Sequence, residues 1–279
     1  MPLKLMYITN KPEIACIAER NDVDRIFVDM EYIGKSERQR GLNSVQNHHT
    51  VEDVVKLRKV LNRAELLVRV NPIHEETFYY CSSEKEIDDV INAGADIVML
   101  PYYKTVREVE RFLKAVSGRC RTMLLLETAE ALKTIEDTLS LDGIDEIHIG
   151  INDLSIALGK KFMFELLVDG TVEYLCRKME TKGKFYGFGG IASLGCGLIP
   201  AEMIIKEHYR LGSGMAILSR SFCNADEIQD LNIIEEIFSS GVQGVRKLEK
   251  ECEEHIKYFS ENRKELKTAV ENVVLRKGK

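Results

Sequence analysis

The chain has 279 residues, of which 44% are hydrophobic and 30% are charged, and its formal net charge is -6. This length matches the roughly 250 residues of one eightfold α/β barrel plus an appendage, and the composition is that of a globular protein with a substantial core. The negative net charge gives no electrostatic reason to expect nucleic acid or an anionic membrane as a partner.

No feature of the sequence marks the chain for export or membrane insertion. It has no basic and apolar leader, and no apolar run approaches the roughly 18 residues needed to cross a bilayer. A cytoplasmic location is therefore expected. The seven cysteines are odd in number, widely scattered and without a C-x-x-C pair, which argues against a disulfide framework and against a thiolate zinc site.

Strand-like and helix-like segments alternate along the chain from its start. Near-continuous apolar runs, typical of buried parallel strands, occupy residues 3–9, 25–31, 66–71, 97–100, 123–127, 146–151, 185–188 and 215–218. Amphipathic helical patterns lie at residues 13–20, 50–61, 84–93, 106–116, 129–139 and 200–212. Repeated alternation indicates a parallel sheet with helices outside it, and eight strands close a barrel. The predicted fold is an α/β TIM (β/α)8 barrel with an additional C-terminal helix.

The chain beyond the eighth strand contains more helix than a barrel requires. We assign residues 1–230 to the barrel and residues 231–279 to the last barrel helix and a C-terminal helical extension. An apolar stripe with helical spacing runs through this extension at Val245, Leu248, Cys252, Ile256 and Phe259. Such a stripe needs an apolar surface to pack against, and a partner subunit and the chain's own barrel are equally good candidates.

Two neighbouring predicted strands each end in a carboxylate, Glu127 and Asp153. One helical segment separates them, so a parallel barrel would bring both to the same mouth, where barrel enzymes carry their active sites. Oxygen donors without cysteine or paired histidine nearby favour a hard ion, Mg²⁺ or Mn²⁺, with water and substrate completing its shell. Either acid alone would equally suit a helix N-terminus, but the pair favours a metal site.

Other strand ends are also charged, acidic at strand two and cationic at strands three and eight. Asp29 and Glu31 lie two residues apart on strand two and so face the same side, and Ser219 and Arg220 follow strand eight. Arg69 interrupts an apolar run. Because a buried guanidinium is costly unless it is paired, Arg69 either bridges internal carboxylates or binds an anionic substrate.

Two further motifs allow a structural and a functional interpretation each. The glycines of residues 187–190 end the seventh predicted strand; they either bind phosphate through backbone N–H groups or simply permit a tight turn. His48 and His49 lie in a long polar connection, residues 34–49. They are either solvated loop residues or, if one reaches the barrel mouth, an acid/base group.

Several stretches at these strand ends resemble the HpcH/HpaI aldolase/citrate lyase family of metal-dependent barrels. The resemblance follows the family order and spacing over residues 27–31, 67–71, 94–101, 125–132 and 149–155. It implies a metal-dependent carbon–carbon lyase of the class II aldolase type, acting through a metal-bound enolate on a 2-oxo acid such as pyruvate, or on its aldol adduct.

The resemblance also implies roles for individual residues. Glu127 and Asp153 would hold the divalent metal, Arg69 would stabilise the enolate, and the backbone around Gly150, Asn152 and Asp153 would bind the substrate carboxylate. Family members tend to form oligomers through their C-terminal helices, so a homo-oligomer is expected.

One position departs from the family pattern. Pyruvate aldolases of the family carry a histidine directly after the strand-two glutamate, here Glu31, and the citrate lyase branch carries an aspartate, whereas this chain has Tyr32. With an ordinary pKa near 10, a tyrosine is a poor base at neutral pH. Three interpretations follow: Tyr32 acts with a metal-bound water that Glu31 positions, His48 or His49 substitutes, or the reaction differs.

Two alternative functions therefore stand beside the aldolase. The basic segment at residues 35–40 resembles the one with which family members that use CoA bind their thioester, so a citrate lyase-like CoA-thioester lyase is one alternative. Tyr32 motivates the other, a catalytically inactive barrel that serves as a binding or assembly subunit.

Overall fold

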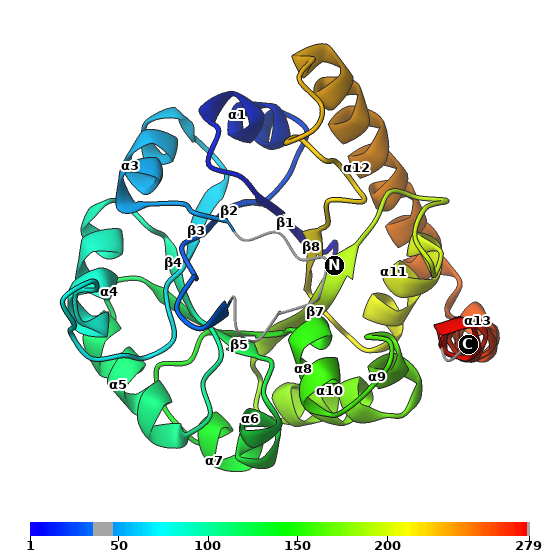
Figure 1. The fold of residues 1–279 in the computed structure, drawn as a ribbon. Coiled ribbons are helices and arrows are strands. Elements are labelled where there is room, and N and C mark those ends of the chain that lie inside the picture. Colours follow the sequence, from blue (N-terminus) through cyan, green and yellow to red (C-terminus); the bar gives the residue numbers. More distant parts are fainter. Residues whose placement is uncertain (36–46, 278–279) are drawn as a thin grey trace.

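The computed structural model describes residues 1–35 and 47–277. Eight parallel strands close a barrel in chain order, with helices on its outside (Figure 1). The strands are β1 (Lys4–Ile8), β2 (Arg25–Asp29), β3 (Glu65–Arg69), β4 (Ile97–Leu100), β5 (Arg121–Leu126), β6 (Glu146–Ile149), β7 (Phe185–Ile191) and β8 (Met215–Leu218). The predicted TIM barrel is confirmed.

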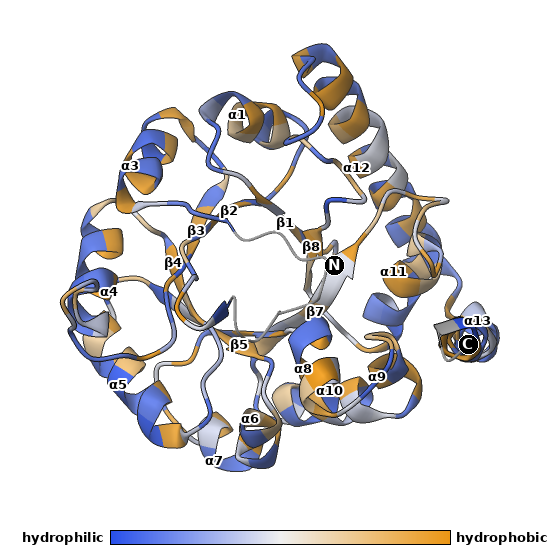
Figure 2. Cartoon of the chain, viewed as in Figure 1, coloured by the Kyte–Doolittle hydropathy of each residue, from blue (hydrophilic) through white to orange (hydrophobic). Residues whose placement is uncertain are grey.

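Helices surround the strands and bury one face each. They are α1 (Pro12–Arg20), α3 (Val51–Val60), α4 (Ser83–Asn92), α5 (Val106–Val116), α6 (Ala129–Lys133), α7 (Ile135–Leu139), α8 (Ile151–Ala157), α9 (Glu165–Val168), α10 (Thr171–Thr181), α11 (Ala201–Arg210), α12 (Leu231–Glu254) and α13 (Phe259–Lys277). Figure 2 shows hydrophobic and hydrophilic residues interspersed along them, as expected for helices with one buried face. Within the described residues, none is long and apolar enough to cross a membrane.

Three details differ from the expected elements. The helical pattern at residues 129–139 forms two short helices, α6 and α7, which meet at Thr134. The chain between β6 and β7 contains three helices, α8, α9 and α10, where the sequence indicated only a helix beginning near Asp153. Strand β7 continues to Ile191, so the glycines of residues 187–190 lie inside a strand, and the register with β8 shifts between Gly187 and Gly190.

Alternate residues of the strands fill the barrel interior in layers. Its middle is apolar, where Met6, Phe27, Leu67 and Met99 are all buried in one cluster. A second, larger apolar cluster lies between the strands and the helices. Because side chains alternate along a strand, the same interior face of β2 carries a charge at each end, one of which closes the barrel floor.

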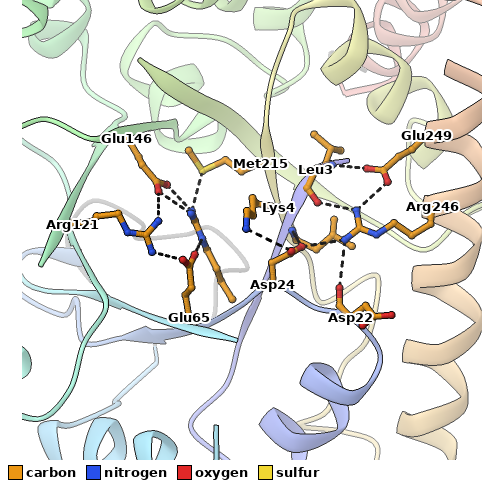
Figure 3. Close-up of polar contacts among 12 residues, drawn as sticks. Leu3, Lys4, Asp22, Asp24, Glu65, Arg121, Glu146, Met215, Arg246 and Glu249 are labelled. Atoms are coloured by element: carbon orange, nitrogen blue, oxygen red, sulfur yellow. Dashed lines mark hydrogen bonds and ion pairs between the residues drawn. The ribbon is translucent and has the colours of Figure 1, made fainter. Parts of the chain in front are cut away.

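A four-residue ion-pair network forms that floor (Figure 3). The guanidinium of Arg25 donates to both oxygens of Glu146, at 2.6 and 2.7 Å, and its Nε donates to Glu65 at 2.8 Å. Arg121 donates to the same two glutamates. Arg25 is 1% exposed, and its partners hold its pKa above the ordinary value although burial alone would lower it.

The C-terminal helices pack on the chain's own barrel. Helix α12 contacts α1 and α11, and α13 contacts α11 and α9, as the arrangement in Figure 1 shows. Val245, Leu248 and Cys252 of the predicted apolar stripe are buried, whereas Ile256 is exposed. The chain itself thus covers much of this stripe, and the homo-oligomer stays a prediction.

Helix α12 also ties down the first strand. Arg246 donates to the carbonyl of Leu3 at 2.8 Å, to Glu249 at 3.0 Å and to Asp24 at 3.1 Å (Figure 3). The N–H of Leu3 donates to Glu249 at 2.8 Å. Two side chains of one helix thus satisfy both backbone groups of the residue that precedes β1.

The floor network predicts unequal effects of two arginine substitutions. Arg25→Ala should lower the free energy of unfolding by about 3–5 kcal/mol, because it leaves buried Glu146 without its bidentate partner. Arg121→Ala, whose side chain is 41% exposed, should cost no more than about 1 kcal/mol. Urea unfolding at pH 7 measures both. Equal losses would show that the bidentate pair does not govern the stability of the floor.

Candidate functional site

A cavity of about 370 Å³ opens at the carboxyl ends of the strands. Its apolar surface includes Phe27, Met99 and Leu125, which belong to the interior cluster, and its polar surface comes from the residues at which the strands end. This is the face on which TIM barrels carry their active sites.

One side of the cavity carries the two predicted metal ligands. Glu127 directly follows β5 and is 3% exposed, and its carboxylate accepts a hydrogen bond of 3.0 Å from the N–H of Tyr102. Asp153 lies in the first turn of α8 and is partly buried. Both line the cavity, together with Gly150, Asn152 and Arg69. The structure thus brings these five predicted site residues to one place.

Gly150 lets the Glu127 carboxylate lie against the chain. A Cβ atom at position 150 would be 2.8 Å from Glu127 Oε2 and 2.9 Å from Glu127 Cβ, closer than van der Waals contact allows. The absence of a side chain at this position therefore determines where the buried carboxylate lies.

The donor set fits a hard divalent cation. Within the described residues there is no group of three or more His, Cys, Asp or Glu side chains arranged to hold a metal. A cation between Glu127 and Asp153 would therefore have two protein carboxylates, with water and substrate filling the remaining positions. Magnesium is typically bound in this way in enzymes, through one or two carboxylates.

Asp29 is the centre of a buried charge cluster beside these carboxylates. It accepts hydrogen bonds from Arg69 at 2.8 Å, Lys35 at 2.9 Å and Asn47 at 2.9 Å, and it is completely buried. Burial alone would raise the pKa of Asp29, but the charges of Arg69 and Lys35 outweigh that effect and hold the pKa far below its usual range. Asp29 is therefore ionised at neutral pH.

Glu31 joins this cluster. Its carboxylate lies 3.3 Å from Arg69 Nη1 and 3.5 Å from Lys35 Nζ. Of the two roles considered for Arg69, pairing with internal carboxylates is present. Arg69 also lines the cavity, so its guanidinium, oriented by Asp29 and Glu31, faces any ligand held there.

His49 is fixed in one tautomer by the same cluster. The backbone N–H of Asp29 donates to His49 Nδ1 at 3.0 Å, so the lone pair is on Nδ1 and the neutral ring carries its proton on Nε2. Burial lowers the pKa of His49, and Lys35 adds to this effect, while Asp29, Asp53 and Asp226 oppose it. The ring, which lines the cavity, is therefore neutral at pH 7.

Three predicted catalytic residues do not line the cavity, although Glu31 contacts Arg69, which does. Among the described residues, Tyr32, Glu31 and His48 do not form part of the cavity wall. His48 is exposed. The ring of Tyr32 packs 5.4 Å from that of Tyr80, and burial raises its pKa further from neutrality. Their catalytic roles stay predictions, and the basic segment proposed to bind CoA lies largely outside the described residues.

The cavity also contains residues that were not assigned a role from the sequence. His148 lies beneath the mouth, donates from Nε2 to the carbonyl of Gly189 at 3.1 Å, and has its pKa lowered to about 4 by burial. Ser219, Arg220 and Asn224 line the cavity after β8, which β7 separates from β6. His148 was detectable because it alternates with Glu146 on one face of β6, whereas Asn224 belongs to a loop with no regular pattern.

The sequence matches a known family over most of the barrel. Residues 4–165 match the family model described as HpcH/HpaI aldolase/citrate lyase. The match covers more than half of the chain, and the chain therefore belongs to the HpcH/HpaI aldolase/citrate lyase family, as the resemblance predicted.

Individual relatives are more distant. A hydroxypyruvate/pyruvate aldolase from Rhizorhabdus wittichii is 31% identical over 99 residues, which are 33% of this chain and only 39% of the relative. A family member from Burkholderia cenocepacia has a similar structure, with a TM-score of 0.63, 13% identity and coverage of 84% and 94% of the two chains. The citrate synthase SbnG gives a TM-score of 0.58 at 17% identity over 88% and 94%. At these identities the structures show a shared fold only.

The Asp29 cluster predicts a pH-dependent contribution to stability. Asp29→Asn should lower the free energy of unfolding at pH 7 by about 3–5 kcal/mol, because buried Arg69 and Lys35 lose their main counter-charge. The pKa of Asp29 is lower in the folded state than its unfolded value near 3.9. Its contribution is therefore complete above about pH 5 and is lost as the pH falls towards the folded pKa.

Denaturant unfolding of both proteins between pH 7 and pH 3 measures this effect. The gap between wild type and Asp29→Asn should narrow as the solution is acidified. Asp88→Asn, which removes a carboxylate paired with Arg119 at the surface, is the matched control and should have little effect. A gap that stays constant over this range would contradict the assignment.

Proposed function

We propose that this protein is a metal-dependent carbon–carbon lyase of the class II aldolase type, which acts on a 2-oxo acid such as pyruvate or on its aldol adduct. The observation that carries this proposal is the convergence of Glu127, Asp153 and Arg69 on one cavity at the carboxyl ends of the strands. The name of the Rhizorhabdus wittichii relative, a hydroxypyruvate/pyruvate aldolase, supports the choice of pyruvate.

The reaction creates negative charge beside a carbonyl group. Breaking the carbon–carbon bond leaves its electron pair on the 2-oxo acid as an enolate, and the other fragment leaves as an aldehyde. A divalent ion held by Glu127 and Asp153 would supply Lewis acidity towards the carbonyl oxygen. Arg69 contributes a guanidinium already oriented by Asp29 and Glu31, so its positive charge is in place before the enolate charge develops.

The backbone beside the metal ligands provides the remaining contacts to the 2-oxo acid. The N–H groups of Asn152 and Asp153 would bind its carboxylate at the start of α8, and Gly150 keeps the approach to Glu127 open. Asn152 is exposed and Gly150 is partly exposed at the cavity, so a small ligand can reach this backbone without displacing a side chain.

His49 is better placed than Tyr32 or His48 to interact with the aldehyde partner. Its Nδ1 is occupied by the N–H of Asp29. Within the described residues no protein group bonds to Nε2, and Nε2 is not among the buried polar atoms without a partner, so it is accessible. The Nε2–H would donate to the aldehyde oxygen, which becomes an alkoxide on addition and takes its proton from water. A neutral imidazole is thus an electrophilic donor here and not a base.

Exchange of the pyruvate methyl protons in D₂O tests the metal-dependent step without knowledge of the aldehyde. We expect exchange that requires added Mg²⁺ or Mn²⁺, detected by proton NMR. Glu127→Gln should lower the rate by about 100-fold or more, because the site loses one of its two carboxylates. Glu130→Gln, an exposed residue on the next helix, is the matched control and should retain the wild-type rate.

The exchange experiment also separates the alternatives. An undiminished rate in Glu127→Gln would remove the metal assignment. If the protein binds manganese but exchanges the protons of no 2-oxo acid, the result would contradict the lyase proposal. It would favour an inactive barrel that acts as a binding subunit.

The assignment of His49 as a neutral donor predicts different results for two substitutions. His49→Gln places an amide N–H near the position of Nε2 and should retain aldol addition to a panel of small aldehydes within about tenfold. His49→Phe removes the donor and should lower the rate of aldol addition by about 100-fold. Two-bond ¹H–¹⁵N spectra of the wild type should show Nε2 protonated and Nδ1 unprotonated from pH 6 to pH 8. Protonation of both nitrogens at pH 7 would exclude this role.

A further inference from the structure

We propose that the cavity contains a second anion-binding subsite, formed by Arg220 with Ser219 and Asn224 on the loop between β8 and α12. This subsite would bind a carboxylate or phosphate group on the second substrate, so the aldehyde partner would itself be an anion. The inference rests on the proposed function, because it names the class of molecule that joins the 2-oxo acid.

Arg220 differs from the other arginine of the cavity wall. Arg69 is held by Asp29 and Glu31, whereas Arg220 makes no ion pair or hydrogen bond with any residue that the structure describes. The carboxylate on the same loop, Asp226, is already paired with Lys11 at 3.0 Å. A guanidinium that lines a cavity without a counter-charge is suited to a ligand that brings one.

Two neutral donors lie beside it. The hydroxyl of Ser219 and the amide of Asn224 line the same cavity, and in the described part of the chain neither side chain has a hydrogen-bond partner. Together with Arg220 they supply guanidinium, hydroxyl and amide donors. Carboxylate and phosphate oxygens accept hydrogen bonds from all three kinds of group.

The loop that carries these donors is held in place by its neighbours. The N–H of Ser219 donates to the carbonyl of Ile191 at 2.9 Å, and the Ser219 carbonyl accepts from the N–H of Phe222 at 2.8 Å. The buried hydroxyl of Tyr7 donates to the carbonyl of Cys223 at 3.0 Å. The backbone of the subsite is therefore ordered before a ligand binds, and only its side chains lose conformational freedom on binding.

The two sides of the cavity are separated by a strand that lacks side chains at the mouth. Strand β7 lies between β6 and β8, and its residues at the cavity are Gly189 and Gly190. A ligand can therefore extend from the carboxylates of β5 and α8 to the guanidinium after β8. If the 2-oxo acid occupies the acidic side, the far end of the aldehyde meets Arg220.

Matched pairs of aldehydes test the subsite in the complete enzyme with Mg²⁺ and pyruvate. The anionic members are glyceraldehyde 3-phosphate and succinic semialdehyde, and their neutral counterparts are glyceraldehyde and butanal. We expect kcat/KM for aldol addition to favour at least one anionic member by about tenfold or more. The pair that shows the preference distinguishes phosphate from carboxylate.

Arg220→Gln should reduce that preference to within about threefold, whereas Arg107→Gln, an exposed arginine on α5 outside the cavity, should retain it. Calorimetric titration with unreactive probes provides a second readout. Glycerol 3-phosphate or 4-hydroxybutyrate should bind about tenfold more tightly than glycerol or 1,4-butanediol, and Arg220→Gln should abolish this difference.

The outcomes separate the subsite from the proposed function. Equal affinity of the wild type for charged and neutral probes, or a preference that survives in Arg220→Gln, would overturn the subsite even if pyruvate exchange is normal. Anion binding that depends on Arg220 would support the subsite, and absence of pyruvate exchange in the same protein would contradict only the lyase.

Discussion

The buried carboxylate of Asp29 organises the mouth of this barrel. Its oxygens bind Arg69, Lys35 and Asn47, and its backbone N–H fixes the tautomer of His49. One residue thus positions the strand that presents the guanidinium and both ends of the connection after β2, including the histidine that lines the cavity. The cost of burying this anion is offset by two cations and an amide, so it cannot be removed without disturbing all of them.

Regular spacing explains which parts of the site could be predicted from the sequence. Glu127 and Asp153 end consecutive βα units, and in a parallel barrel the ends of neighbouring strands meet at one edge. Arg69 was conspicuous as a charge within an apolar run. These features depend only on strand periodicity and order, so they could be inferred without coordinates, as could the closed eight-stranded barrel itself.

The parts of the site that could not be predicted depend on tertiary contacts, which leave no local pattern in the sequence. Nothing in the sequence distinguishes His48 from His49, yet only the second accepts the N–H of Asp29, because the direction of a loop side chain is set by tertiary contacts. The glycines of β7 were interpreted as a turn or a phosphate site. In the structure a Cβ at Gly187 would lie 2.2 Å from the carbonyl oxygen of Met215, so close strand packing explains that glycine.

The attachment of α12 to the first strand bears on how the chain folds during synthesis. β1 pairs with β8, and Leu3 is bound by Glu249, 246 residues later. The first strand therefore has one exposed edge and an unsatisfied leading residue until nearly the whole chain has been made. Contacts this distant in sequence form slowly, and open strand edges are prone to pair with other chains. During synthesis, β1 is thus the strand whose edge stays open longest.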